Sequence, residues 1–206
     1  MVNIKKNTNF TIEKYLLIIL TMEIKGSAVK SIQEFVKNNH KSGYQKWIDS
    51  LPESSKNIMK NKIDVTKWYP LEASVIPPIN SLAKLYYNNN TKQVAIETGK
   101  YSAETGLKGI YKVFLLIASP EFIINRAGRI FQSYYSPSEI IVKESSKKTV
   151  TLHITKFPTP NQTVEYRIAG WIEHALKLAK CNNVRTIITK SLTKGDNVTE
   201  IISSWN

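Results

Sequence analysis

Cysteine is almost absent from this chain of 206 residues, in which Cys181 is the only one. A single thiol excludes an internal disulfide and a zinc site built from several cysteines. Chains without disulfides are typical of reducing compartments. We therefore predict a cytoplasmic protein.

Long apolar runs are also missing. The longest run near the start, Tyr15–Leu20, is shorter than the apolar core of a signal peptide, and Glu23 and Lys25 follow it closely. A membrane-spanning helix needs about 20 apolar residues, and no stretch of the sequence approaches that length. We predict an N-terminal extension over residues 1–23, a single domain over residues 24–206, and no membrane span.

Acidic residues are few beside the basic ones: 16 Asp and Glu stand against 29 Lys and Arg, for a net charge of +13. The excess is spread along the chain, because residues 1–70 hold twelve basic and six acidic residues and residues 71–206 hold seventeen and ten. Only four of the basic residues are arginine, the side chain best suited to reading bases and phosphates. This diffuse lysine surplus indicates a solvated surface and leaves nucleic-acid binding as a minor alternative.

The motifs that carry common chemistry are missing too. The sequence holds no phosphate-binding loop, no dinucleotide fingerprint and no nucleophile elbow. Its histidines, His40, His153 and His174, lack a ligand-type partner three or four residues away. We predict that the protein is not an enzyme and holds no metal and no cofactor. A catalytic site assembled from scattered residues is the alternative.

A helical period of 3.6 residues dominates the first two thirds of the sequence. The positions at which we expect a helix to open, break or be interrupted carry glycine, proline or a capping residue. We expect helices to open after Gly26, near Ser42, at the capping-box spacing Ser50–Glu53, after Trp68–Leu71 and at Ser119–Glu121, a break or kink at Pro77-Pro78, and a long helical stretch over residues 92–117 interrupted at Gly106 and Gly109.

After Pro137 the apolar period changes from 3.6 to 2. Short strands are predicted over Glu139–Lys143 and around Val150–Ile154, a helix over residues 166–180, and a last hairpin from Val184–Leu192 and Val198–Trp205. The predicted fold class is α+β: an N-terminal helical half is followed by an antiparallel sheet, in the order strand-strand-helix-strand-strand, packed on helices.

Six short segments, in this order, resemble an uncharacterised bacterial family expanded in myxobacteria. They are Lys25–Ala28, Trp68–Pro70, Gly99–Glu104, Ser119–Phe122, Gly170–Glu173 and the Lys194–Asp196 hairpin that ends at Trp205. The match covers about residues 24–205. More distantly, the pattern resembles the fold shared by haem nitric-oxide sensors, vinyl-reductase-type domains and TRAPP vesicle-tethering subunits. This resemblance implies a pocket between helices and sheet, often in a dimer.

The sequence departs from the haem sensors at the residues that would hold haem. Their iron-ligating histidine lies on the helix that corresponds here to Pro120–Tyr134, which contains no histidine, and Ile130 stands where that ligand is expected. Their Tyr-x-Ser-x-Arg signature is missing at Tyr134–Pro137. The cysteines that vinyl-reductase-type domains often carry around the last hairpin are missing as well. Haem ligation of the sensor type is therefore not expected.

Aromatic side chains are plentiful, and large aromatics serve either as core or as the wall of an apolar pocket. The candidate pocket residues are Tyr69, Tyr101, Phe114, Arg126, Ile130, Phe131, Tyr134 and Trp171. Arg126 falls on the apolar stripe of the predicted Pro120–Tyr134 helix, where an unpaired charge is costly. It is expected to pair with Glu104, with a ligand acid as the alternative.

These observations favour a small-molecule-binding sensory or regulatory module with an apolar pocket under the Pro120–Tyr134 helix, acting as a homodimer. The alternative is a structural protein–protein interaction subunit related to the vesicle-tethering domains. In either case the protein acts by binding, since the groups that carry chemistry are not recognisable in its sequence.

Overall fold

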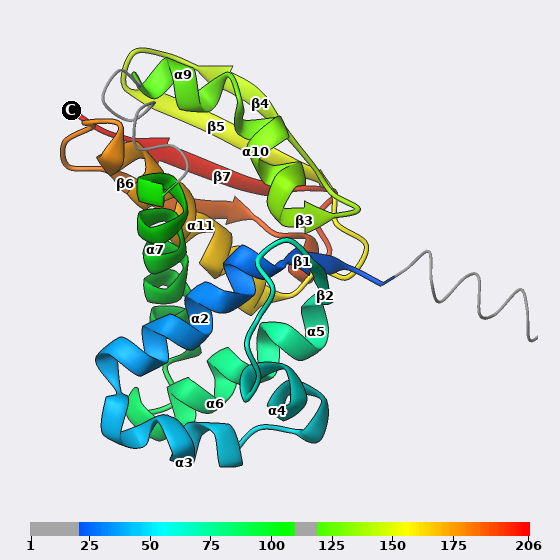
Figure 1. The fold of residues 1–206 in the computed structure, drawn as a ribbon. Helices are drawn as coiled ribbons and strands as arrows, with labels where there is room; N and C mark the ends of the chain where they lie inside the picture. The colour runs from blue at the N-terminus through cyan, green and yellow to red at the C-terminus, as the bar shows by residue number, and fades with distance from the viewer. Residues whose placement is uncertain (1–20, 110–118) are drawn as a thin grey trace, which may run out of the picture.

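The computed structural model describes residues 21–109 and 119–206. Helices from the first half of the chain form one end of the molecule, and a four-stranded sheet with its covering helices forms the other (Figure 1). Two helices, α7 (Thr91–Gly109) and α11 (Gln162–Leu178), run side by side between the two ends. The predicted α+β class, with helices first and antiparallel sheet last, is confirmed.

The helical end is built from short amphipathic helices. They are α2 (Gly26–Asn39), α3 (Tyr44–Asp49), α4 (Glu53–Met59), α5 (Leu71–Ser74) and α6 (Ile76–Tyr86). In α2 the apolar residues recur every three or four positions and are all buried, as the period predicts, together with Gly26, Ser31 and Gln33. The predicted break at Pro77-Pro78 is confirmed, because α5 ends at Ser74 and both prolines lie in the first turn of α6.

The helices predicted to open near Ser42 and at Ser50–Glu53 begin there, α3 after Gly43 and α4 at Glu53. The expected capping box is absent, because the N-cap of α4 is Pro52, which makes no side-chain capping bond. The Ser50 hydroxyl instead donates to the Trp47 carbonyl at 2.6 Å, since Ser50 directly follows α3 and satisfies the end of that helix.

The predicted interruption at Gly106 is also wrong, because α7 continues through it to Gly109. A Cβ atom on Gly106 would collide with the Tyr134 hydroxyl, so this glycine permits close packing rather than a break. Residues 110–117 of the predicted helical stretch lie outside the described residues.

The predicted helix Pro120–Tyr134 is two helices, α9 (Pro120–Ile124) and α10 (Ala127–Tyr134). Ser119 caps α9 as predicted, accepting a hydrogen bond from the Phe122 amide at 3.4 Å. The first helix ends in a tight turn, in which the Arg126 amide donates to the Ile123 carbonyl three residues back. Arg126 has φ −109° and ψ 3°, outside the helical region, so the chain changes direction there.

The main sheet has the order β4-β5-β7-β6, and each pair of neighbouring strands is antiparallel. The strands are β4 (Glu139–Ser145), β5 (Thr149–Lys156), β6 (Arg185–Lys190) and β7 (Thr199–Ser204), and α11 joins β5 to β6. Val150, Leu152 and Ile154 alternate with half-buried residues and point to the core, as their period predicts. The order strand-strand-helix-strand-strand is confirmed.

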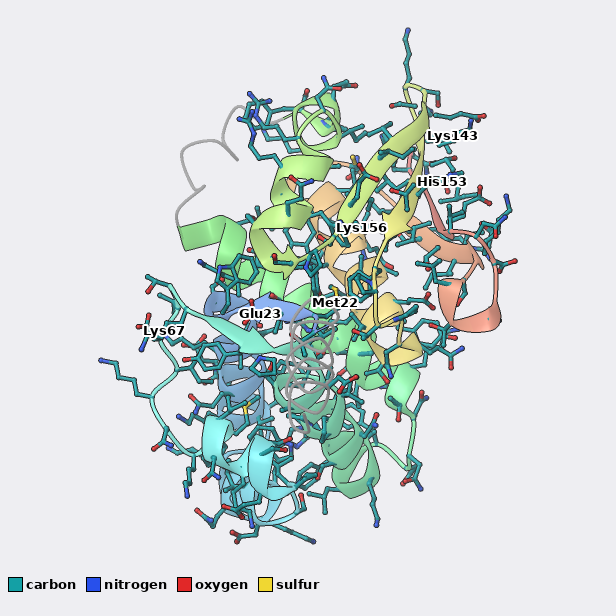
Figure 2. The ribbon with its side chains drawn as sticks, turned by 90° about the vertical axis from the view of Figure 1, so that its right-hand side faces the viewer. Met22, Glu23, Lys67, Lys143, His153 and Lys156 are labelled. Carbon is teal, nitrogen blue, oxygen red and sulfur yellow. The ribbon has the colours of Figure 1, made fainter. Side chains whose placement is uncertain are left out.

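A second, three-stranded sheet was not predicted. Its order is β2-β1-β3, with β1 (Glu23–Lys25) between β2 (Trp68–Pro70) and β3 (Tyr135–Ser136). Figure 2 labels Met22 and Glu23 at the start of β1 and Lys67 just before β2. This sheet joins the two ends of the molecule, because β2 leads into α5 while β3 follows α10.

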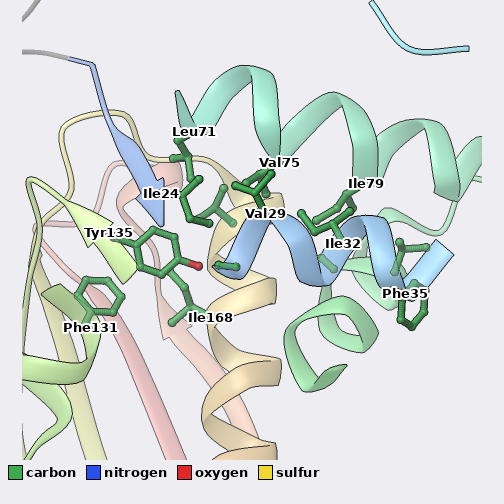
Figure 3. Close-up of a cluster of buried hydrophobic side chains, with 14 of the residues drawn as sticks. Ile24, Val29, Ile32, Phe35, Leu71, Val75, Ile79, Phe131, Tyr135 and Ile168 are labelled. Carbon is green, nitrogen blue, oxygen red and sulfur yellow. The ribbon is translucent and has the colours of Figure 1, made fainter. Parts of the chain in front are cut away.

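One large apolar cluster extends from Met22 to Trp205 and includes residues from both ends of the molecule. Figure 3 shows Ile24, Val29 and Leu71 from the helical end close to Tyr135 and Ile168 from the other. Between residues 21–109 and 119–206, no helix has the length and apolar character required to cross a bilayer.

Candidate functional site

A cavity of about 60 Å³ lies between the helices α9, α10 and α11 and the core-facing side of β4 and β5. Its wall is almost entirely aliphatic and aromatic. The lining residues are Ile123, Ile124, Ala127, Ile130, Phe131, Tyr134, Tyr135, Ile140, Val150, Leu152, Arg167, Ile168, Trp171, Ile172, Ala175 and Leu176. Figure 3 shows Phe131, Tyr135 and Ile168 converging from α10, β3 and α11.

Four of the predicted pocket residues meet at this cavity: Ile130, Phe131, Tyr134 and Trp171. The first three come from α10 and the fourth from α11. The Tyr134 and Trp171 rings contact edge to face, with their centroids 5.7 Å apart. These four side chains come together because α10 packs over the face of the sheet that α11 also covers.

Two predicted residues lie elsewhere. Tyr69 is in β2, where its hydroxyl accepts a hydrogen bond from the Asp64 amide at 2.9 Å. Tyr101 is in α7, where its hydroxyl accepts one from the Asn38 side chain at 2.7 Å. Neither belongs to the described lining of the cavity. Phe114 lies outside the described residues.

The prediction for Arg126 is wrong. The break between α9 and α10 takes this residue off the apolar stripe and exposes it. Its guanidinium lies over the Phe122 ring, 3.7 Å from the centroid, and donates to the Phe122 carbonyl at 3.4 Å. The expected partner, Glu104, has its carboxylate 2.6 Å from His174 Nε2 instead.

The buried arginine of this site is Arg167, which sequence reasoning missed. Its side chain is 1% exposed and lines the cavity from the second turn of α11. One terminal guanidinium nitrogen donates to the Tyr135 hydroxyl at 3.2 Å. The other donates to the Ala28 carbonyl at 3.0 Å and to the Ser31 hydroxyl at 3.1 Å. Arg167 thus connects the cavity to α2 at the helical end.

Two buried donors on the cavity wall have no hydrogen-bond partner within the described chain: Nε of Arg167 and Nε1 of Trp171. The two residues are four apart on α11, which places them on the same face of the helix. No described carboxylate forms an ion pair with Arg167. A buried charge and buried donors left without partners are both unfavourable.

The buried carboxylate nearest to Arg167 in the sequence, Glu165, is fully engaged elsewhere. It accepts hydrogen bonds from the hydroxyls of Ser191 and Thr199, at 2.6 and 2.5 Å, and from the Thr193 amide at 3.4 Å. These bonds hold the turn between β6 and β7 against α11. Glu165 is therefore a structural carboxylate.

Two further titratable side chains, Glu200 and Cys181, have shifted pKa values. The Glu200 carboxylate lies 2.7 Å from His153 Nε2, and hydrogen bonds from Thr189, His153 and Lys190 lower its pKa to about 2. Burial, with a smaller contribution from the charge of Glu121, raises the pKa of the Cys181 thiol to about 11. Over residues 21–109 and 119–206, no three His, Cys, Asp or Glu side chains gather as metal ligands would.

The cavity residues do not fit a haem held by histidine. Ile130, where the resemblance places the iron ligand, lies on the cavity wall with a side chain that has no lone pair to donate. None of His40, His153 and His174 belongs to the described lining. The volume of about 60 Å³ is also far below the 300–1,000 Å³ typical of sites for drug-sized ligands.

Comparison with known proteins identifies the fold but shows no family to which the chain belongs. No family model matches the chain, and no curated protein matches it. An H-NOX protein from S. oneidensis in the Fe(II)NO ligation state is 11% identical, with a TM-score of 0.68 over 89% of this chain and 99% of the other. The unliganded Fe(II) H-NOX protein from K. algicida is 10% identical, with a TM-score of 0.63 over 89% and 97%. The described chain therefore has the fold of the H-NOX proteins.

Proposed function

We propose that this chain is a non-enzymatic sensory module that binds a small apolar molecule in the cavity beneath α10. The observation that carries the proposal is the cavity itself, an aliphatic and aromatic space inside an otherwise packed core. Protein interiors are close-packed, and their few voids are small. Apolar cavities of this kind stay dry and take up small apolar molecules.

The position of the cavity supports a sensory role. Arg167 and Tyr135 both line it, and they contact each other and α2 through a short chain of hydrogen bonds. A ligand that displaces either side chain changes the contact between the sheet end and the helical end. A ligand shifts such an equilibrium only by its difference in affinity for the two arrangements, so occupancy of the cavity has to favour one position of α2.

The test is binding of xenon and 1-butanol, followed by amide chemical shifts of the protein. We expect the largest shifts at α10, α11 and β5. Ala127→Phe places a ring in the cavity and is expected to abolish them. Gln132→Phe, which adds the same ring on the exposed side of α10, is the matched control and is expected to bind normally. Absence of binding to the unaltered protein would contradict the proposal.

Two finer predictions belong with this proposal. Kinship with the family expanded in myxobacteria rests on the six sequence segments alone. The prediction of a homodimer rests on the dimers that domains of the resembling folds often form. Light scattering of the purified chain tests the dimer directly, since a mass of about 47 kDa is expected for two copies of 23.5 kDa. A mass of one copy at all concentrations would contradict it.

A second candidate function is that of a protein-interaction subunit. Ile141 and Ile187 lie on the outer side of the main sheet, opposite the side covered by α10 and α11, and each is 43% exposed. His153, labelled in Figure 2, pairs with Ile141 on this side. The double change Ile141→Lys and Ile187→Lys should prevent any association that uses this surface, measured by size-exclusion chromatography with a partner or a second copy. Association of the double variant to the same extent as the unaltered protein would contradict this role.

A further inference from the structure

An open groove of about 840 Å³ lies at the helical end of the molecule, between α2 and the segment that follows α4. Its volume is within the 300–1,000 Å³ typical of small-molecule sites. It shares no lining residue with the cavity beneath α10, and most of its wall is polar or charged. The ionisable residues of the wall are Lys30, Glu34, Lys37, Lys60, Lys62 and Asp64.

Both carboxylates of the groove already have partners. Glu34 forms an ion pair with Lys30 at 3.2 Å, one turn away on α2. Asp64 accepts hydrogen bonds from the hydroxyl and the amide of Thr66, at 2.7 and 2.9 Å, and these bonds lower the pKa of Asp64. Neither carboxylate is therefore left to neutralise the other lysines of the wall.

Those other lysines are Lys37, Lys60 and Lys62. None of them forms an ion pair within residues 21–109 and 119–206. All three are exposed, so an anion from solution can reach them. An anionic group in the groove would thus meet three positive charges that no described carboxylate neutralises.

The buried side chain of Gln33 holds the two walls of the groove together. Its amide nitrogen donates to the Met59 carbonyl at 2.6 Å and to the Asn61 carbonyl at 3.0 Å, on either side of Lys60. Its amide oxygen accepts a hydrogen bond from Lys37 Nζ at 3.2 Å. Because both atoms belong to one amide group, the Lys37 ammonium lies beside the segment that carries Lys60. The positive charges of the two walls are therefore brought together before any ligand binds.

The kind of cation indicates the kind of anion. Lysine is a compact point charge and a common partner of phosphate, whereas the planar guanidinium of arginine suits two-point recognition of a carboxylate. The first arginine of the sequence is Arg126, so none belongs to the helical end. Three lysines on two facing walls favour a ligand with more than one phosphate group.

We infer that this groove binds a multiply phosphorylated small molecule, whose phosphate groups lie between Lys37 on α2 and Lys60 and Lys62 on the facing segment. The groove is separate from the cavity beneath α10, so its occupancy does not depend on the proposed function. The same chemistry occurs in free phosphorylated compounds and in phosphorylated lipid headgroups, and the experiment distinguishes these sources.

The first measurement is a titration of the full chain with inorganic tripolyphosphate and with inorganic monophosphate, followed by amide chemical shifts. We expect shifts in α2 and in residues 60–65. Tripolyphosphate should bind at least about tenfold more tightly than monophosphate, because it makes several charge-assisted contacts at once.

Vesicles separate the two sources of phosphate. The protein is sedimented with vesicles of phosphatidylcholine that contain a few per cent of phosphatidylinositol bisphosphate. Sedimentation that tripolyphosphate reverses assigns the groove to a lipid headgroup. Binding of tripolyphosphate without sedimentation assigns it to a soluble compound.

Two double variants locate the site. Lys60→Gln with Lys62→Gln removes two exposed cations from the groove and should weaken tripolyphosphate about tenfold. Lys147→Gln with Lys148→Gln is the matched control, because it lowers the net charge equally at the turn between β4 and β5. This control should leave the affinity for tripolyphosphate nearly unchanged.

Three results would overturn the inference. Equal weakening by the two double variants would show that the overall charge alone attracts the anion. Equal binding of monophosphate and tripolyphosphate would exclude a multiply phosphorylated ligand. Absence of tripolyphosphate binding would exclude the site, while uptake of xenon and 1-butanol by the cavity beneath α10 would be unaffected.

Discussion

Cys181 is a single thiol reporter placed just after α11. It is 6% exposed, and its pKa of about 11 means that very little thiolate is present at pH 8. We expect a thiol reagent such as Ellman's reagent to leave the native protein largely unmodified for minutes and to react with one thiol per chain once denaturant unfolds it. Rapid reaction of the native protein would show that Cys181 is accessible and contradict its burial.

The Glu200 carboxylate offers a pH-dependent measurement. Its pKa of about 2 is held down first by the hydrogen bond from Thr189, then by His153 and Lys190. Because the folded-state pKa lies below the ordinary value of 4.5, this carboxylate stabilises the fold above about pH 4.5, and the contribution is lost as pH falls toward 2. Thr189→Val removes the largest cause and should raise the pKa, measured by side-chain NMR titration.

A conservative control separates the hydrogen bond from the shape of the side chain. Thr189→Ser keeps the hydroxyl and should leave the pKa of Glu200 at about 2. The Thr189→Val protein should also lose less stability than the unaltered protein between pH 5 and pH 2.5, since less of its Glu200 contribution remains to be lost. An unchanged Glu200 titration in Thr189→Val would refute the assigned cause.

Single residues show where sequence reasoning succeeded and where it overlooked an available signal. Ile130, Phe131, Tyr134 and Trp171 were found because large apolar residues on a helix face turn toward the core. The argument about a charge on an apolar stripe was sound but was applied to Arg126 instead of Arg167. Val164, Ile168 and Trp171 surround Arg167 on α11 at helical spacing, and that signal was available in the sequence.

At the scale of elements, the contact between α7 and α11 depends on glycine. A Cβ atom on Gly170 would collide with the Ile96 carbonyl, and one on Gly99 with the Arg167 carbonyl. We expect Gly170→Ala to destabilise the fold by about 1–3 kcal/mol or more, because neither backbone can retreat without disturbing its helix. Urea unfolding measures the change.

Gly128→Ala in α10 is the matched control for this prediction. Its Cβ atom would lie 3.2 Å from the Ile140 carbonyl, a much milder approach. The gain in helix propensity is about 0.5–1 kcal/mol, so the net change should be small. Equal destabilisation by Gly128→Ala and Gly170→Ala would argue against close backbone packing as the cause.

Elements with a clear period were predictable, and those without one were not. The alternation in β5 and the helical stripe of α2 each extend over enough residues to define a period. Strands β1, β2 and β3 have two or three residues each, too few to show any period. Their pairing joins segments far apart in the sequence, so only the folded chain reveals it.

At the scale of the whole molecule, the likeness in fold does not extend to the residues of the cavity. The chain has the H-NOX fold, yet Ile130 and the small volume do not fit haem. We expect the purified protein mixed with haemin to show no sharp Soret band of a histidine-ligated haem. Ile130→His should also show no such band, because the cavity is too small for haem even when the missing histidine is supplied. A stoichiometric band in either protein would contradict this prediction.

The order of elements and the α+β class followed from local patterns, but the connection between the two ends did not. Arg167 binds the Ala28 carbonyl across 139 positions of sequence. No period or motif links residues at that separation. The cavity shares this property, since its wall is complete only when α10, α11 and the sheet are packed together.

The small sheet depends on the first strand of the described chain. Strand β1 is the middle strand, its Ile24 is completely buried, and the backbone on either side of it bonds to Lys67 and Leu71. Excision of the chain up to Lys25 would leave β2 and β3 as two unpaired edges with nothing between them. An N-terminal truncation made at residue 24, the predicted domain boundary, cuts into this strand, so a shortened version of the protein has to keep Met22 and Glu23.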